Sequence, residues 1–153
     1  MNLSRIKSFH GGLEIWKEYN ELEWLEQAFE APNLIIKSGA TEQIRSHLEL
    51  QLQKDGWALK SPVSNQYDLE ITAKKQKLGF QIQTGNISRA AYDLLKLQTM
   101  YLDRIIEAAC LAVPTQKAAN ILGGNLANEN RLIKELNLFD RHITLPLILL
   151  SFE

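Results

Sequence analysis

Apolar residues recur at helical spacing in four parts of this chain. A period of three to four residues runs through Leu13–Phe29, Thr41–Lys54, the stretch that begins at Ser88, and Asn128–Phe139. Ser88 is a suitable N-cap, and Gly56 follows the second stretch as a stop. The pattern therefore predicts four helices that each bury one face.

Other stretches have the pattern of strands. Lys77–Thr84 alternates, with Leu78, Phe80 and Ile82 on one face and Gly79, Gln81 and Gln83 on the other. Ala108–Val113 and Leu145–Phe152 are nearly continuous apolar runs, which is typical of strands buried on both faces. Shorter extended segments are predicted at Asn33–Lys37, Trp57–Lys60 and Gln66–Ile71. The order of elements predicts an α/β fold, a mixed central β-sheet flanked by helices.

Composition limits the alternatives. The chain has 153 residues, 45% of them hydrophobic and 23% charged, so we expect a single domain over 1–153. Within it we distinguish an acidic N-terminal helix in 1–31, packed on the core or at a dimer interface, from a core in 32–153. The single cysteine, Cys110, excludes a disulfide within the monomer, and no apolar run approaches the ~20 residues of a membrane span. A cytoplasmic location is expected.

Charge is distributed unevenly. Residues 1–31 carry three basic and six acidic side chains, whereas residues 72–104 carry six basic and two acidic ones. A local basic zone can contact phosphates even when the whole chain has a net charge of -1. The same zone is also compatible with an ordinary solvated surface, and charge alone does not choose between these interpretations.

Chemistry concentrates between Tyr67 and Gln98. If the strand that contains Asp68 pairs with the next one as a meander, Asp68, Gln81 and Gln83 converge at one edge of the sheet. A carboxylate and a second oxygen ligand there could bind Mg²⁺, which activates water against a phosphate. Alternatively, the two glutamines are the wet face of a half-exposed strand.

The residues that follow carry a family resemblance. Gln81-Ile-Gln83-Thr-Gly-Asn86 precedes Arg89 and a helix with Asp93-Leu-Leu-Lys-Leu-Gln98, and Ala112-Val-Pro114 ends the buried strand. Over roughly residues 40–153 this resembles the PD-(D/E)xK nucleases. It is most similar to the branch of type II restriction endonucleases typified by BglII and BstYI, which has Glu-x-Gln in place of Glu-x-Lys.

The resemblance implies a Mg²⁺-dependent type II restriction endonuclease, with Mn²⁺ as a possible substitute, that cleaves double-stranded DNA as a homodimer. Asp68 would be the first metal ligand, Gln81 the second, and Gln83 would orient the attacking water. Glu49 stands where related nucleases often keep an acidic residue. The family has Glu at the place of Gln81, so we expect a weakened site, for which Glu70 could compensate.

DNA contacts are expected from the basic zone and from one loop. The candidates are Lys74, Lys75, Lys77, Asn86, Arg89, Lys117 and Asn120. The last two belong to a predicted polar loop from Thr115 to Asn128, whose Asn and Gln side chains suit adenine readout. Two alternatives remain: a catalytically inactive nuclease-fold domain that binds DNA or another protein, and an interaction domain without a nucleic-acid partner.

Overall fold

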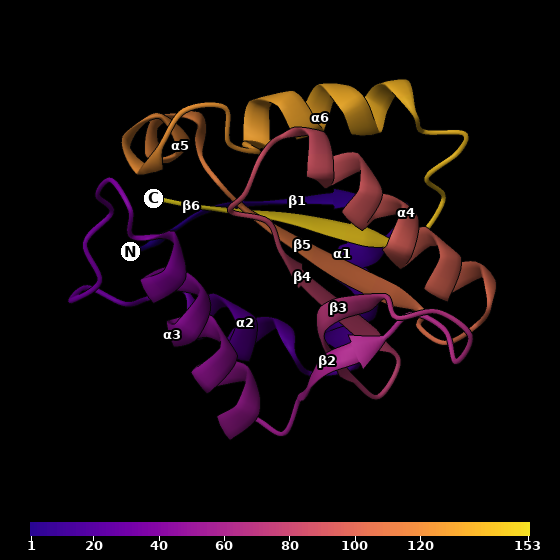
Figure 1. The fold of residues 1–153 in the computed structure, drawn as a ribbon. Coiled ribbons are helices and arrows are strands. Elements are labelled where there is room, and N and C mark those ends of the chain that lie inside the picture. Colours follow the sequence, from indigo (N-terminus) through magenta and orange to yellow (C-terminus); the bar gives the residue numbers. More distant parts are fainter.

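Three parallel strands form the centre of a six-stranded sheet in the computed structural model, which describes residues 1–153 (Figure 1). The strands are β1 (Leu3–Phe9), β2 (Ala58–Pro62), β3 (Glu70–Lys75), β4 (Leu78–Ile82), β5 (Ala108–Pro114) and β6 (Leu147–Phe152). Their order is β1-β6-β5-β4-β3-β2. β4, β5 and β6 are parallel, while β1 and the β3–β2 pair add antiparallel edges. The predicted mixed sheet is confirmed.

Helices cover both faces of this sheet (Figure 1). They are α1 (Gly12–Glu18), α2 (Leu22–Ala28), α3 (Thr41–Lys54), α4 (Ser88–Leu102), α5 (Gln116–Leu122) and α6 (Glu129–Leu138). The first three helices pack on one face, and α4 and α6 pack on the other. No helix combines the length and the apolar character needed to cross a membrane.

The two faces have different cores. The face under α1–α3 is aromatic: Trp16 stacks on Trp57 with ring centroids 5.8 Å apart, and Phe29 lies 5.6 Å from Phe152. The face under α4 and α6 is aliphatic. Successive side chains of β5 feed alternate faces, as the two-residue period of a strand requires. This explains why β5 is apolar throughout.

The N-terminal part differs from the prediction. Leu13–Phe29 forms two short helices instead of one, because Asn20 adopts a left-handed backbone conformation with φ 57°. β1 was not predicted, and Asn33–Lys37 forms no strand. β1 alternates poorly because it is an edge strand whose burial varies along its length.

The strand predicted at Gln66–Ile71 begins four residues later in the structure. Gln66–Leu69 is a loop, and β3 begins only at Glu70, so Lys74 and Lys75 belong to the strand and the turn lies at Gln76, with φ 50°. This four-residue displacement decides which side chain of β3 faces Gln81.

Candidate functional site

A polar pocket lies where β4 ends and α4 begins. Its volume is about 510 Å³. It is lined by Arg45, Gln81, Gln83, Gly85, Ser88, Arg89, Tyr92, Asp93 and Lys96. The carboxyl ends of parallel strands are the usual place for ligands in α/β sheets. We call this space the strand-end pocket.

Thr72 is the β3 residue beside Gln81. The antiparallel register pairs Ala73 with Phe80, so Thr72 comes opposite Gln81. The backbone N–H and the hydroxyl of Thr72 both donate to Gln81 Oε1, at 2.9 and 3.3 Å. Thr72 Oγ1 also accepts from the N–H of Ile82 at 3.1 Å. The Gln81 amide oxygen is therefore occupied by a neutral neighbour.

Gln83 is buried and fully engaged as well. Its Oε1 accepts from the N–H of Gly85 at 2.7 Å, and its Nε2 donates to Asp93 Oδ2 at 2.5 Å. A Cβ at Gly85 would lie only 3.0 Å from Gln83 Oε1, so glycine suits this close turn. Lys96 Nζ pairs with the other oxygen of Asp93 at 2.7 Å. Gln83 and Gln81 face α4 and are not the wet face of a strand.

Asp68 does not lie beside the glutamines. It is exposed in the loop before β3, four residues ahead of Thr72, and it does not line the pocket. Glu70 is also exposed, and only its backbone carbonyl reaches the pocket region, where it accepts from Lys96 Nζ at 2.8 Å. The predicted convergence of Asp68 with Gln81 and Gln83 is absent.

Helix α3 contributes one wall of the pocket. Arg45 donates from Nε to Thr84 Oγ1 at 2.9 Å, and its guanidinium makes no ion pair. Glu49 lies one turn further along α3, half-buried, and it does not line the pocket. Sequence reasoning missed both Arg45 and Thr72. Counting outward from a turn placed at Gln76 would have found Thr72.

The donor set does not fit a Mg²⁺ site. Mg²⁺ is held through carboxylates and water in octahedral geometry. Here the Gln81 and Gln83 oxygens are already bonded, and the single carboxylate of the pocket, Asp93, is neutralised by Lys96. Nowhere do three or more His, Cys, Asp or Glu side chains come together as a possible metal site. The residues of this chain therefore do not supply the metal site that the resemblance implies.

The predicted DNA-contacting residues separate into two groups. Lys74, Lys75 and Lys77 lie at the turn end of the β3–β4 hairpin, away from the strand-end pocket. Asn86 and Arg89 lie beside the pocket. Asn86 Oδ1 accepts from both the N–H and the hydroxyl of Ser88 at 2.9 Å, whereas Arg89 is exposed without a side-chain partner. Asn86 thus orders the turn and leaves Arg89 available.

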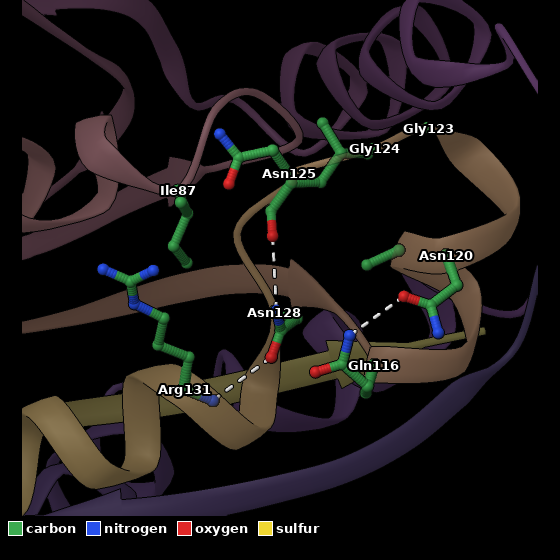
Figure 2. Close-up of a pocket in the computed structure, with 10 residues that line it drawn as sticks. Ile87, Gln116, Asn120, Gly123, Gly124, Asn125, Asn128 and Arg131 are labelled. Atoms are coloured by element: carbon green, nitrogen blue, oxygen red, sulfur yellow. Dashed lines mark hydrogen bonds between the residues drawn. The ribbon is translucent and has the colours of Figure 1, made fainter.

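A second polar pocket adjoins the same turn (Figure 2). Its volume is about 450 Å³, and Ile87 and Arg131 line it together with amide side chains and two glycines. The amides are those of Gln116, Asn120, Asn125 and Asn128. Gln116 Nε2 donates to Asn120 Oδ1 at 3.0 Å, and Asn128 Oδ1 accepts from the N–H of Arg131 at 3.1 Å. We call this space the amide pocket.

The amide pocket corrects the predicted loop from Thr115 to Asn128. That segment contains α5, which Thr115 caps by accepting from the N–H of Ala118 at 3.1 Å. Lys117 is exposed on α5, and Asn120 enters the amide pocket (Figure 2). The sequence carries little signal for this short helix, because only three of its seven residues are buried.

Comparisons with known proteins agree with this architecture. The model of the family described as "Restriction endonuclease BglII/BglIII" matches residues 4–152. The chain is similar to the crystal structure of restriction endonuclease BglII complexed with a DNA 16-mer, with a TM-score of 0.82 and 13% sequence identity over 99% of this chain and 76% of that one. It is also similar to free BglII, with a TM-score of 0.73 and 13% identity over 100% of this chain and 80% of that one.

No curated protein matches the chain in sequence. The identity to the solved structures is low, so these two likenesses describe the fold, while the family match extends over almost the whole sequence and includes the N-terminal helices. The mixed sheet agrees with this match, and the chain belongs to the BglII/BglIII restriction endonuclease family.

Proposed function

We propose that this chain binds double-stranded DNA across the edge where β4 and β5 end. The observation that carries the proposal is the placement of the strand-end pocket and the amide pocket on the two sides of one turn, with Ile87 lining one and Ser88 lining the other. One pocket offers cations for phosphates and the other offers amides for base edges. The crystal structure of BglII with a DNA 16-mer supports DNA as the partner.

The family membership raises cleavage as the natural activity, and the residues at the site argue against it for this chain. A metal-dependent nuclease needs carboxylates that hold the cation and stabilise charge on the phosphate. Thr72 and Gln81 stand side by side without one. We therefore propose a DNA-binding protein with the restriction endonuclease fold and without Mg²⁺-dependent cleavage.

Self-association is part of the proposal. α4 and α6 expose large apolar side chains on neighbouring surfaces: Leu95 is 57% exposed and Leu138 75%. Leu95 and Phe139 line one apolar groove of about 220 Å³. A homodimer through this face would bury these side chains, and a two-fold axis would match a palindromic DNA site.

DNA binding is tested with fluorescently labelled duplexes of mixed sequence, followed by selection from a random duplex pool. We expect salt-sensitive binding, because phosphate contacts release counterions from DNA, and enrichment of a palindrome. Binding that does not weaken as salt rises, or no binding, would contradict the proposal.

Cleavage is tested with plasmid DNA and Mg²⁺ or Mn²⁺. We expect no discrete fragments from the chain as it stands. Discrete fragments that disappear in Asp68→Ala would show that the exposed carboxylate reaches the site during catalysis, and the non-cleaving function would be abandoned.

The dimer is tested by light scattering coupled to gel filtration. Leu138→Arg should yield a monomer that still unfolds cooperatively, since Leu138 is exposed in the isolated chain. Lys134→Ala on the same helix is the matched control. A parent protein that is monomeric with and without DNA would contradict this part.

A further inference from the structure

We infer that the strand-end pocket binds a backbone phosphate of DNA directly through arginine, in the place where a metal-dependent nuclease holds its cation, so that DNA binding needs no Mg²⁺. The inference rests on the proposed DNA-binding function and specifies the chemistry of its central contact.

Thr72 lies opposite Gln81, at the point where β3 and β4 separate. β3 and β4 stop pairing after Ala73 and Phe80, and Thr72 bridges the separating backbones by donating to Gln81 and accepting from Ile82. A carboxylate at position 72 would lie beside Gln81, which lines the pocket. The chain has a hydroxyl and an amide there, and they satisfy one another. The pair contributes no negative charge.

Asp93 is the single acidic residue that lines the pocket. Asp93 is 5% exposed, and Gln83 Nε2 and Lys96 Nζ occupy its two oxygens at 2.5 and 2.7 Å. Removing it from these partners to ligate a cation would leave a buried ammonium without its counter-ion, which is costly. Asp93 is therefore a positioning residue for Gln83 and Lys96.

The net charge of the pocket lining is positive. The pocket lining holds Arg45, Arg89 and Lys96 against the single carboxylate of Asp93, a formal charge of +2. Neither arginine pairs with a carboxylate. Such a lining repels a divalent cation and attracts an anion, and guanidinium groups match the oxygens of a phosphate in paired geometry. The charge of the pocket is opposite to that of a metal site.

Asp68 and Glu70 do not reverse this balance. Both side chains are exposed, and neither lines the pocket. Glu70 contributes only its carbonyl, which helps fix Lys96 Nζ.

The experiment measures the affinity of the full chain for a labelled mixed-sequence duplex, in EDTA and in Mg²⁺ at matched ionic strength. Arg45→Gln and Arg89→Gln are compared with Lys54→Gln, an exposed cation nine residues after Arg45 on α3 and about 14 Å away along the helix. We expect binding in EDTA that Mg²⁺ does not strengthen. Each arginine variant should bind about tenfold more weakly, with a log–log salt slope reduced by about 0.9, whereas Lys54→Gln should bind like the parent.

The outcomes separate the two proposals. Absence of DNA binding in both buffers would overturn the proposed function. Binding that requires Mg²⁺, or arginine variants that bind like the parent while the parent binds in EDTA, would overturn the direct phosphate contact and leave DNA binding standing.

A restored site gives an independent readout. In Thr72→Asp/Gln81→Glu, the two strand positions that face one another both become carboxylates, so Mg²⁺ should raise the thermal unfolding midpoint, while the parent should not respond. Adding Asp68→Ala to the double variant should leave the response intact. A parent that already responds to Mg²⁺, or a response in the double variant that disappears with Asp68→Ala, would contradict the inference. Unfolding curves in EDTA verify that each variant is folded.

Discussion

The two ends of the β3–β4 hairpin carry cations with different environments. At the turn end, Lys75 Nζ pairs with Glu21 at 2.6 Å and with Asp55 at 2.8 Å. Lys74 and Lys77 donate to backbone carbonyls at 2.7 and 2.8 Å. At the strand end, the guanidinium groups that line the pocket have no carboxylate partner.

This difference shows that a count of charges in a sequence window does not distinguish paired cations from unpaired ones. The basic zone over residues 72–104 includes cations from both ends, and a single number treats them alike. At the turn end, Lys75 is held in ion pairs, and Lys74 and Lys77 donate to backbone carbonyls, so these lysines stabilise the fold. Two arginines of this zone, Arg89 at the strand end and Arg104 after α4, have no ion pair, and of these only Arg89 lines the strand-end pocket. Whether a cation can bind DNA therefore depends on its partners in the folded chain, which the sequence window does not show.

The largest expected effect is at the turn end. Lys75→Met should lower the free energy of unfolding by about 3 kcal/mol, because it leaves buried Glu21 beside Asp55 without their shared cation. Urea unfolding measures this. Lys74→Met, at a neighbouring residue with only a carbonyl partner, is the control and should change stability by less than about 0.5 kcal/mol. Equal effects of the two substitutions would show that the ion-pair cluster does not hold α2, α3 and β3 together.

The side-chain amides of the amide pocket also divide into those that stabilise the fold and those that are available to DNA. Asn128 caps α6 and is buried, so Asn128→Ala should lower the free energy of unfolding by about 1 kcal/mol. Asn120 is exposed and bonds only to another surface amide, so Asn120→Ala should leave stability unchanged and weaken DNA binding instead. Thermal unfolding and duplex titration of both variants test this. A loss of stability in Asn120→Ala would assign it to the fold.

Some elements of the fold could be predicted from the sequence because their signals are local. The helix Thr41–Lys54 was predicted with its observed bounds, because a regular apolar face and a glycine stop are local features. The alternation of β4 was also predicted, but its second face was not expected to be buried. That burial depends on α4, which packs there through tertiary contacts.

The candidate site shows the limit more sharply. Gln81, Gln83, Asn86 and Arg89 were identified from the sequence and do gather at one edge. The partner of Gln81 was not, because strand register depends on where the turn forms, and a shift of a few residues exchanges one side chain for another. Arg45 reaches the pocket from a separate helix, so no local pattern could assign it to the site.

A smaller effect is expected from pH at the turn end. Burial raises the pKa of Glu21 above its ordinary 4.5. Burial lowers the pKa of Lys75, but hydrogen bonds to Asp55 and Glu21 together outweigh it and raise that pKa above 10.5. A carboxyl whose pKa is higher in the folded chain adds stability that is complete below 4.5 and is lost as pH rises through the folded pKa. The raised pKa of Lys75 acts in the same direction: the stability that it adds is complete below pH 10.5 and is lost as pH rises through the folded pKa.

Glu21→Gln removes the pH dependence that the Glu21 carboxyl gives to the free energy of unfolding. The difference in free energy of unfolding between the parent and Glu21→Gln should therefore shift in favour of the variant as pH rises from about 4.5 toward neutrality. Urea titrations at several pH values measure the difference, in which the other carboxylates cancel. A difference that shifts toward the parent over this range would mean that pairing with Lys75 outweighs burial at Glu21.

The smallest expected effect is the most direct test of the comparison. Lys74→Gln and Lys77→Gln each remove a positive charge from the same basic zone as Arg89, yet both cations lie at the turn end and donate to backbone carbonyls. If position and pairing decide availability, each variant should bind duplex DNA within about twofold of the parent, with an unchanged salt slope. If instead the whole zone forms the DNA-binding surface, each should lower the slope as much as Arg89→Gln does. The slope is the better observable, since it reports the number of phosphates contacted even where a small loss of stability alters the fraction of active protein. Equal slopes for the parent and both lysine variants, beside a lower slope for Arg89→Gln, would place the DNA at the strand end alone.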